Sequence, residues 1–128
     1  MRPRNRGFTL IELMVACAIV ATLAAVAYPS YLSHIRTSAR ASAKAQMMDI
    51  ANREQQFLLA NRSYAAKPDL EASGYALPAD VSARYTYEIA VVSSPPAFTV
   101  TFTPYAGQAS DGPLTIASDG TKTPADKW

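Results

Sequence analysis

The sequence predicts an α+β fold, in which a long N-terminal helix with a transmembrane first half packs against a small antiparallel β-sheet. The first observation is an almost wholly apolar stretch over residues 8–27, followed by apolar residues at helical intervals up to residue 64. The second is a set of short alternating runs over residues 85–123, separated by proline and glycine turn signals. A chain of 128 residues leaves room for one globular domain beyond such a helix.

The apolar stretch has the length and the flanks of a membrane span. From Phe8 to Ala27 it contains one charged residue, Glu12. Twenty residues of helix extend over roughly 30 Å, which is the thickness of a bilayer's hydrocarbon core. The basic residues that precede it are Arg2, Arg4 and Arg6. By the positive-inside rule these stay in the cytoplasm, so we expect a single-pass segment with the rest of the chain outside.

Three ordinary interpretations compete for this segment. A secretory signal peptide would be removed after its apolar part, and Ala25–Ala27 offers a small-x-small site. A lipoprotein would be cut before Cys17, because Met14–Cys17 loosely resembles a lipobox. An ordinary membrane anchor explains the length and the flanks. None of the three accounts for Glu12.

Glu12 decides between these interpretations. A carboxylate inside a lipid-embedded helix costs at least about 2.5 kcal/mol, so it is rare there without a partner. The simple explanation is a protonated or snorkelling side chain near the cytoplasmic edge. The functional explanation is that Glu12 awaits a cation that is present only in an assembly.

After Pro29 the pattern becomes amphipathic, which predicts that the same helix continues into a soluble domain. The apolar positions fall near steps of three, four or seven, and they are Ile35, Ala39, Ala43, Met47, Ile50 and Phe57. Charged residues between them include Asp49, Arg53 and Glu54, and a basic trio repeats every four residues at Arg36, Arg40 and Lys44. The trio is either a solvated face or a contact with lipid headgroups or with acidic residues of a neighbouring subunit.

Residues 61–84 contain several helix breakers and predict mostly connecting loop. Residues 85–91 and 98–103 then alternate apolar and polar side chains, which predicts an antiparallel pair of strands joined by a proline-containing turn. A third strand is expected at Leu114–Ile116, between two Asp-Gly turns, and a short last strand near Thr121–Thr123. The apolar stripe of the helix is the natural cover for one face of this sheet.

The composition gives no sign of catalysis. The chain has one histidine, His34, one cysteine, Cys17, and no glycine-rich phosphate loop, so we expect no enzyme, no cofactor and no metal. Asp111, Asp119 and Asp126 are better explained as turn formers than as calcium ligands. Twelve basic residues oppose ten acidic ones, and three of the basic residues precede Gly7. Removal of that leader leaves a nearly neutral chain, which does not favour nucleic acid as a partner.

The residues Arg6-Gly7-Phe8-Thr9-Leu10-Ile11-Glu12-Leu13 resemble the class III signal of type IV prepilins. This resemblance implies that a prepilin peptidase cuts after Gly7 and that Phe8 becomes the N-methylated terminus. It assigns Glu12 to subunit assembly, through the new ammonium group of a neighbouring subunit, and Pro29 to a helix kink. Residues 8–64, which end in EQQFLLANRSY, are similar to the long helix of PilE-type minor pilins.

The resemblance implies an organisation and a function for the whole chain. We expect a leader peptide over residues 1–7, a transmembrane assembly helix over 8–28 and a periplasmic pilin domain over 29–128. The expected function is a structural subunit, a minor pilin, of a type IV pilus that supports pilus biogenesis, twitching motility or adhesion. The alternatives are a DNA-binding competence pilin and a pseudopilin of type II secretion.

The same resemblance implies partners and a location. The expected partners are other pilin subunits, the prepilin peptidase, the assembly platform of the inner membrane and the lipid of that membrane. The expected location is the inner membrane of a Gram-negative bacterium and then the extracellular pilus. Many relatives close their C-terminal region with a disulfide, but the single Cys17 excludes one here. We therefore expect turns, packing and Trp128 to hold the tail.

Overall fold

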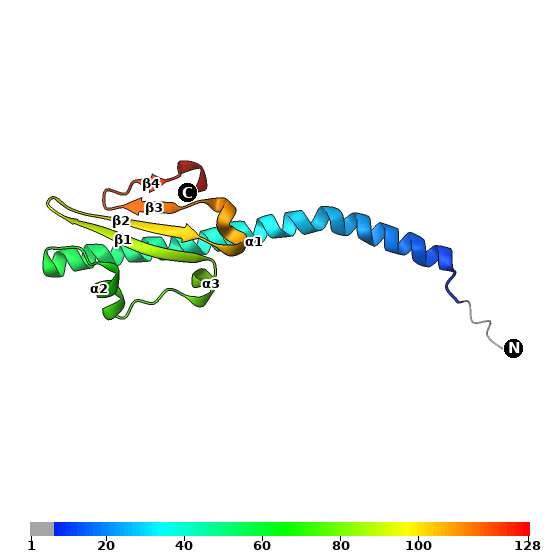
Figure 1. The fold of residues 1–128 in the computed structure, drawn as a ribbon, viewed down its shortest axis with the longest axis horizontal. Coiled ribbons are helices and arrows are strands. Elements are labelled where there is room, and N and C mark those ends of the chain that lie inside the picture. The colour runs from blue at the N-terminus through cyan, green and yellow to red at the C-terminus, as the bar shows by residue number, and fades with distance from the viewer. Residues whose placement is uncertain (1–6) are drawn as a thin grey trace. The chain divides into compact units, whose positions relative to one another are not determined.

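The computed structural model describes residues 7–128, so the basic residues of the expected leader, Arg2, Arg4 and Arg6, lie outside the described part. The chain divides into two compact units, one that ends at Ile35 and one that comprises Arg36–Trp128. The helix α1, Leu10–Asn61, contributes residues to both units (Figure 1). The predicted helix over residues 8–64 is therefore confirmed, with ends two or three residues shorter.

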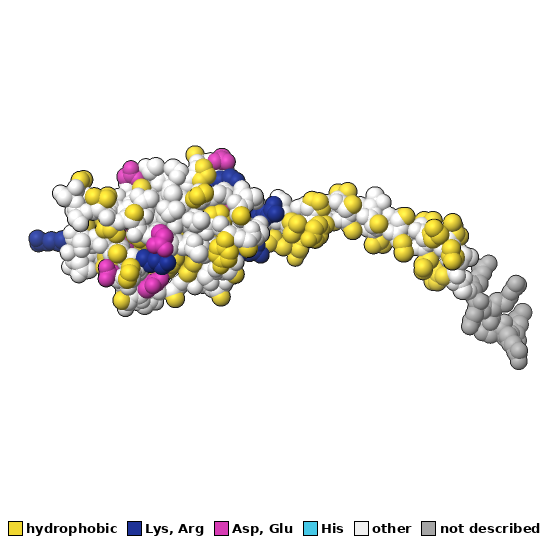
Figure 2. Space-filling model, viewed as in Figure 1, with side chains coloured by type: hydrophobic (Ala, Val, Ile, Leu, Met, Phe, Trp, Pro, Cys, Tyr) yellow, Lys and Arg dark blue, Asp and Glu magenta, His cyan; other side chains and the backbone are white. Residues whose placement is uncertain are grey.

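The first unit contains the apolar half of α1. Among the described residues, α1 is the helix long and apolar enough to cross a membrane, and its most apolar window is wholly exposed. The hydroxyl group of Thr22 donates to the carbonyl oxygen of Ala18 at 2.8 Å, which satisfies this polar group within the helix. Apolar side chains crowd the visible face of this segment (Figure 2). Pro29 lies inside α1, and the kink at that position stays a prediction.

The second unit contains a four-stranded antiparallel sheet in the order β1-β2-β3-β4. The strands are β1, Tyr85–Ser93; β2, Pro96–Pro104; β3, Leu114–Ala117; and β4, Lys122–Thr123. The register places Tyr87 opposite Phe102 and Ile89 opposite Val100, so the apolar residues of β1 and β2 share one face. The four predicted strands are confirmed, and β1 and β2 each extend slightly beyond their predicted ends.

The second half of α1 covers the apolar face of the sheet (Figure 1). Ala43, Met47 and Ile50 of the predicted stripe are fully buried, and they join Val100 and Phe102 in the core. Glu54 is also fully buried, which the sequence analysis did not expect. Its position follows Met47 and Ile50 by helical steps, so the backbone geometry places it on the buried face despite its charge.

The prediction of mostly loop over residues 61–84 was incomplete, because two short helices lie there: α2, Lys67–Ala72, and α3, Ala79–Ser82. Each has a proline at or just before its start. Pro68 lies in the first turn of α2, and Pro78 is the residue that precedes α3. Proline is well tolerated at a helix start, since the backbone N–H that it lacks has no helical partner there.

All three side chains of the basic trio contact the C-terminal part of the same chain, although Arg36 stays exposed and Arg40 and Lys44 are only partly buried. The guanidinium Nε of Arg36 donates to the carbonyl oxygen of Gly107 at 3.1 Å. Arg40 forms a bidentate ion pair with Asp111, in which its Nε and one terminal nitrogen each donate to a carboxylate oxygen. The ammonium group of Lys44 lies 5.9 Å from the centre of the Trp128 ring. The trio thus ties the helix to the 3₁₀ segment η1, Ala106–Asp111, and to Trp128, which follows the 3₁₀ segment η2, Ala125–Lys127.

The C-terminal tail is held without a disulfide, as expected. The indole Nε1–H of Trp128 donates to the carbonyl oxygen of Thr123 at 3.1 Å. The ammonium group of Lys122 lies 4.9 Å from the centre of the same ring, which also packs against the core. Such cation–π contacts contribute about 0.5–1 kcal/mol each at exposed sites. The tail is therefore fixed by several weak contacts instead of one covalent bond.

Candidate functional site: the start of the apolar helix

The Gly7–Phe8 peptide bond lies in a non-helical segment just before α1 begins at Leu10. Phe8 is 88% exposed, and among the described residues no atom outside the immediate chain neighbours lies within 4 Å of the position that a Cβ on Gly7 would occupy. Exposed segments outside regular structure are the preferred sites of proteolysis, because a peptidase must bind extended backbone. The structure therefore leaves this bond accessible to a cleaving enzyme.

Thr9 and Glu12 form a capping box at the start of α1. The Glu12 carboxylate accepts hydrogen bonds from the backbone N–H of Thr9, at 2.8 Å, and from its hydroxyl group, at 2.7 Å. In return, the backbone N–H of Glu12 donates to the Thr9 hydroxyl oxygen at 3.3 Å. This reciprocal pattern satisfies backbone donors that the first helical turn cannot satisfy by itself. Glu12 thus has a partner within its own chain before any assembly.

Thr9 was not among the residues predicted to have a role. The signal was present, since a threonine followed three residues later by glutamate, just before an apolar run, is the sequence pattern of a capping box. The structure brings Gly7, Phe8 and Glu12 to the same end of α1, whereas Pro29 lies well inside the helix. Cleavage after Gly7 would place a new ammonium group on Phe8, one residue before the capping threonine.

A second polar group of the chain is the buried cluster around Asp111. Its carboxylate pairs with Arg40 and accepts hydrogen bonds from Gln108, at 2.6 Å, and from the hydroxyl group of Tyr85, at 3.2 Å. The hydrogen bond from Arg40 holds the pKa of Asp111 below its ordinary value, with further help from Gln108. The amide of Gln108 also donates to the carbonyl oxygen of Arg36 at 2.9 Å. This cluster joins η1 to α1, so its role is structural.

A third feature is the lysine–tryptophan surface, which comprises Lys44, Lys122 and Trp128. Both ammonium groups lie against the Trp128 ring, and neither has an ion pair among the described residues. The surface therefore presents two uncompensated positive charges beside one aromatic ring. That combination suits the phosphates and bases of a nucleic acid.

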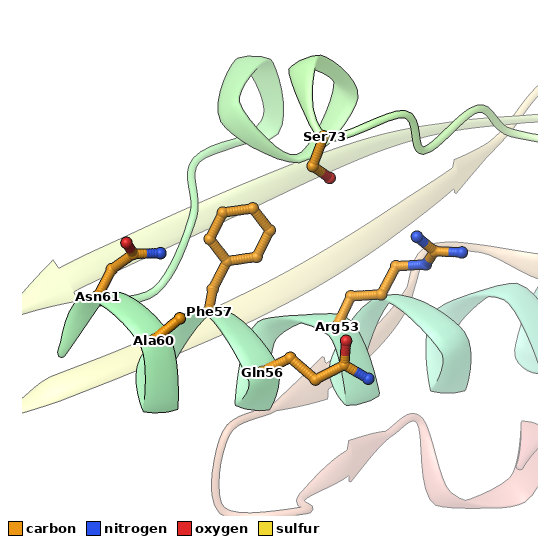
Figure 3. Close-up of a pocket in the computed structure, with 6 residues that line it drawn as sticks. All are labelled: Arg53, Gln56, Phe57, Ala60, Asn61 and Ser73. Atoms are coloured by element: carbon orange, nitrogen blue, oxygen red, sulfur yellow. The ribbon is translucent and has the colours of Figure 1, made fainter.

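An open groove of about 280 Å³ lies between the end of α1 and the end of α2 (Figure 3). Its lining residues are Arg53, Gln56, Phe57, Ala60, Asn61 and Ser73. In Figure 3 the Phe57 ring projects from α1 toward the α2 side, where Ser73 forms the facing wall. Over residues 7–128, no group of three or more histidine, cysteine, aspartate or glutamate side chains is placed to hold a metal ion.

Comparison with known proteins defines the class first. Over 70% of this chain and 92% of the other, the fold matches a solved type IV pilin from Shewanella oneidensis, with a TM-score of 0.55 and 18% sequence identity. A long N-terminal helix packed against a four-stranded antiparallel sheet is thus the fold of a type IV pilin. Residues 2–28 match the prokaryotic N-terminal methylation motif, which contains the Gly7–Phe8 bond and Glu12.

The family follows from the remaining part of the chain. Residues 29–115 match the model of the type IV minor pilin ComP, DNA uptake sequence receptor. The chain belongs to this family of type IV pilins. It is a family of structural subunits, and the predicted resemblance and fold are both confirmed.

Curated relatives are also type IV pilins. The chain is 38% identical over 63 residues to the major pilin PilA of Myxococcus xanthus, and 32% identical over 94 residues to the major pilin PilE1 of Neisseria gonorrhoeae. These matches cover 49% and 73% of this chain. They span 29% and 42% of the two relatives, so the chain matches less than half the length of either.

Proposed function

We propose that the chain is a prepilin that is cut between Gly7 and Phe8 and then incorporated, as a minor subunit, into a type IV pilus. The observation that supports this most strongly is the exposed, non-helical Gly7–Phe8 bond followed directly by an apolar helix that starts with a capped glutamate. The enzyme that cuts would be the prepilin peptidase of the inner membrane. The filament would support pilus biogenesis, twitching motility or adhesion.

Assembly depends on burying the exposed half of α1 against the same helices of neighbouring subunits. Apolar contact alone does not fix the axial position of one helix against another. A charged pair between the Phe8 ammonium group of one subunit and Glu12 of its neighbour would fix that position, because each charge is costly in an apolar core without the other. The Thr9 cap keeps the carboxylate hydrogen-bonded until that partner arrives.

Replacement of Gly7 by leucine should leave the precursor uncut. The position beside the scissile bond is open in this chain, so the branched side chain would be accommodated in the precursor and rejected only by the peptidase. The measurement is the intact mass of the protein recovered from a host with an active prepilin peptidase. The wild-type chain should lose residues 1–7 and gain a methyl group on Phe8, whereas Gly7→Leu should keep all its residues.

The matched control for this experiment is Gly107→Leu, which changes another open glycine far from the cleavage site. This variant should be processed normally. A mature, methylated Phe8 terminus in Gly7→Leu would contradict the proposed site, and a wild-type chain that starts elsewhere would contradict the whole proposal.

A second candidate function is that of a DNA receptor within the pilus. Two observations favour it: the family model that matches residues 29–115 is described as a DNA uptake sequence receptor, and the lysine–tryptophan surface offers two unpaired cations beside an aromatic ring. The second unit as a whole is close to neutral, so this local surface would have to supply the attraction for phosphates.

The test of DNA binding is a salt titration with duplex DNA and the full chain in detergent micelles. Lys44→Gln/Lys122→Gln should weaken binding and reduce the slope of log K against log salt by about 2, one for each lost phosphate contact. Glutamine keeps most of each stem but removes both cation–π contacts with Trp128, so thermal unfolding of this double variant must show that the second unit stays folded. Arg62→Gln/Arg84→Gln removes two cations elsewhere and should leave the slope unchanged. Equal losses in both double variants, or no salt-sensitive binding in the wild type, would exclude this surface as the receptor site.

A further inference from the structure

Glu54 is a fully buried carboxyl group on the sheet-facing side of α1. One oxygen, Oε2, accepts a hydrogen bond from the backbone N–H of Ala65 at 2.8 Å. The other oxygen, Oε1, is buried and has no hydrogen-bond partner within residues 7–128. A buried carboxylate with an unsatisfied oxygen is costly, because it has lost its water and gained a single donor in exchange.

The hydrogen bond to Ala65 fixes the chain where it turns back after α1. The helix ends at Asn61, and Arg62 has a φ of 57°, the left-handed conformation that commonly terminates helices. The return segment, residues 62–66, then runs back to α2, and Ala65 within it is only 3% exposed. The return segment leads into α2, and Ser73 at the end of α2 forms one wall of the groove in Figure 3.

The charged side chains near Glu54 in the chain are engaged elsewhere. Arg53, its neighbour in α1, pairs with Asp49 at 3.0 Å and lies 5.3 Å from the centre of the Tyr75 ring. Lys67, which begins α2, donates to the carbonyl oxygen of Tyr87 at 3.0 Å and pairs with Glu88 at 3.3 Å.

Tyr64, which precedes Ala65 in the return segment, makes uncharged contacts. Tyr64 of the return segment packs edge-on against Phe98 of β2, and its hydroxyl group lies 3.5 Å from the Gln55 side chain. Burial raises the pKa of Glu54, and the Ala65 hydrogen bond offsets this rise only in part. Within the described part of the chain, the Glu54 carboxylate thus has one backbone donor and no ion pair.

We propose that Glu54 is a proton-dependent latch: the return segment and α2 dock firmly on α1 when Glu54 is protonated, and they loosen when it ionises. A neutral carboxyl group can stay in this pocket at little electrostatic cost. A carboxylate gains by moving toward water, and the route to water is separation of the return segment from α1. The groove of Figure 3 would then be tight in acid and wider at higher pH.

The direction of the pH effect follows from the shift of the pKa on folding. A carboxyl group whose pKa is raised in the folded state contributes stability that is fully present below its unfolded value. That stability is lost as the pH rises through the folded value. The wild-type return segment should therefore be better protected near pH 4 than near pH 8.

The test is amide hydrogen exchange of the full chain in detergent micelles, followed at Ala65 between pH 4 and pH 8. After correction for intrinsic exchange, the protection of Ala65 in the wild type should fall about tenfold for each unit by which folding raises the pKa of Glu54. Glu54→Gln, which imitates the neutral acid, should show the same protection at both ends of the range. Glu88→Gln removes an exposed carboxylate next to the Lys67 contact and should keep the wild-type pH dependence.

Two outcomes would overturn the latch. One is a pH dependence at Ala65 that survives in Glu54→Gln. The other is a titration of the Glu54 carboxyl carbon, followed by ¹³C NMR in the wild type, with a midpoint at or below the ordinary value of a glutamate side chain. The NMR titration needs no variant, so the proposal stays testable even if Glu54→Gln does not fold. Neither result would bear on cleavage after Gly7, which involves the other end of the helix.

Discussion

The variant Glu12→Ala should be cut and methylated like the wild type but should enter filaments at a small fraction of the wild-type level. Cleavage depends on the exposed bond before α1, which this change leaves in place. Assembly, by contrast, would leave the ammonium group of each neighbouring Phe8 in an apolar bundle without a counter-charge. An unpaired charge buried in this way costs about 3–5 kcal/mol, which corresponds to a loss of at least a hundredfold in the equilibrium for incorporation.

Because Glu12 also caps the helix, two further variants are needed to separate its roles. Glu12→Gln keeps an oxygen that can accept from the Thr9 backbone N–H but removes the charge, so it should assemble as poorly as alanine. Thr9→Val removes the hydroxyl group of the capping box but keeps the carboxylate, so it should cost about 1 kcal/mol of helix stability and still assemble. The measurement is the ratio of sheared-filament to membrane-bound subunit by immunoblot. Normal incorporation of Glu12→Gln would show that the charge pair is not what holds subunits together.

The variant Asp111→Ala should destabilise the second unit by about 3 kcal/mol, because it leaves Arg40 half-buried without its partner. It also removes the acceptor for Gln108 and for the Tyr85 hydroxyl group. For a unit of this size, a loss of about 3 kcal/mol in the free energy of unfolding lowers the melting temperature by more than about 10 °C. Thermal unfolding followed by circular dichroism in micelles measures this effect at neutral pH.

The control for Asp111 is Asp119→Ala, which removes an exposed turn aspartate whose carboxylate accepts from the backbone N–H of Thr121 at 2.8 Å. This change should cost much less than the loss of Asp111. The pH dependence gives a second check. Since the pKa of Asp111 is lowered in the fold, its contribution is present above the unfolded value and is lost as the pH falls through the folded one. The difference between wild type and Asp111→Ala should therefore shrink in acid, and a constant difference would argue against the ion pair.

The contacts of the basic trio show where sequence reasoning ends. A repeat of Arg36, Arg40 and Lys44 every four residues shows that they share a helix face, but it does not show what covers that face. The answer depends on contacts such as Arg40–Asp111, which join residues 71 positions apart, and one sequence contains no signal for such a pairing. The strands were predictable because alternation is local, and the Thr9–Glu12 cap could have been predicted for the same reason.

Glu54 marks a different limit. The periodicity that predicted the burial of Met47 and Ile50 also places Glu54 on the buried face of α1. Because Glu54 is charged, however, it was predicted to lie on the polar face. Charged residues are rarely buried without a partner, and that rule usually outweighs periodicity. Here the partner is a backbone N–H group of the return segment, that of Ala65. Because every residue except proline has such a group, no sequence pattern indicates which one will pair with Glu54.

The sheet is a simple meander, in which each strand pairs with the next one along the chain. Such local pairing favours rapid formation of the sheet, because little loop entropy is lost at each step. The contacts of the α1 side chains with the C-terminal part, by contrast, join residues that are far apart in sequence. Arg40 and Lys44 contact Asp111 and Trp128, which lie near the end of the chain. The residues of α1 come first in the chain, but their contact partners come last. A subunit truncated before residue 106 would therefore keep the apolar half of α1 but leave the three basic side chains without their partners.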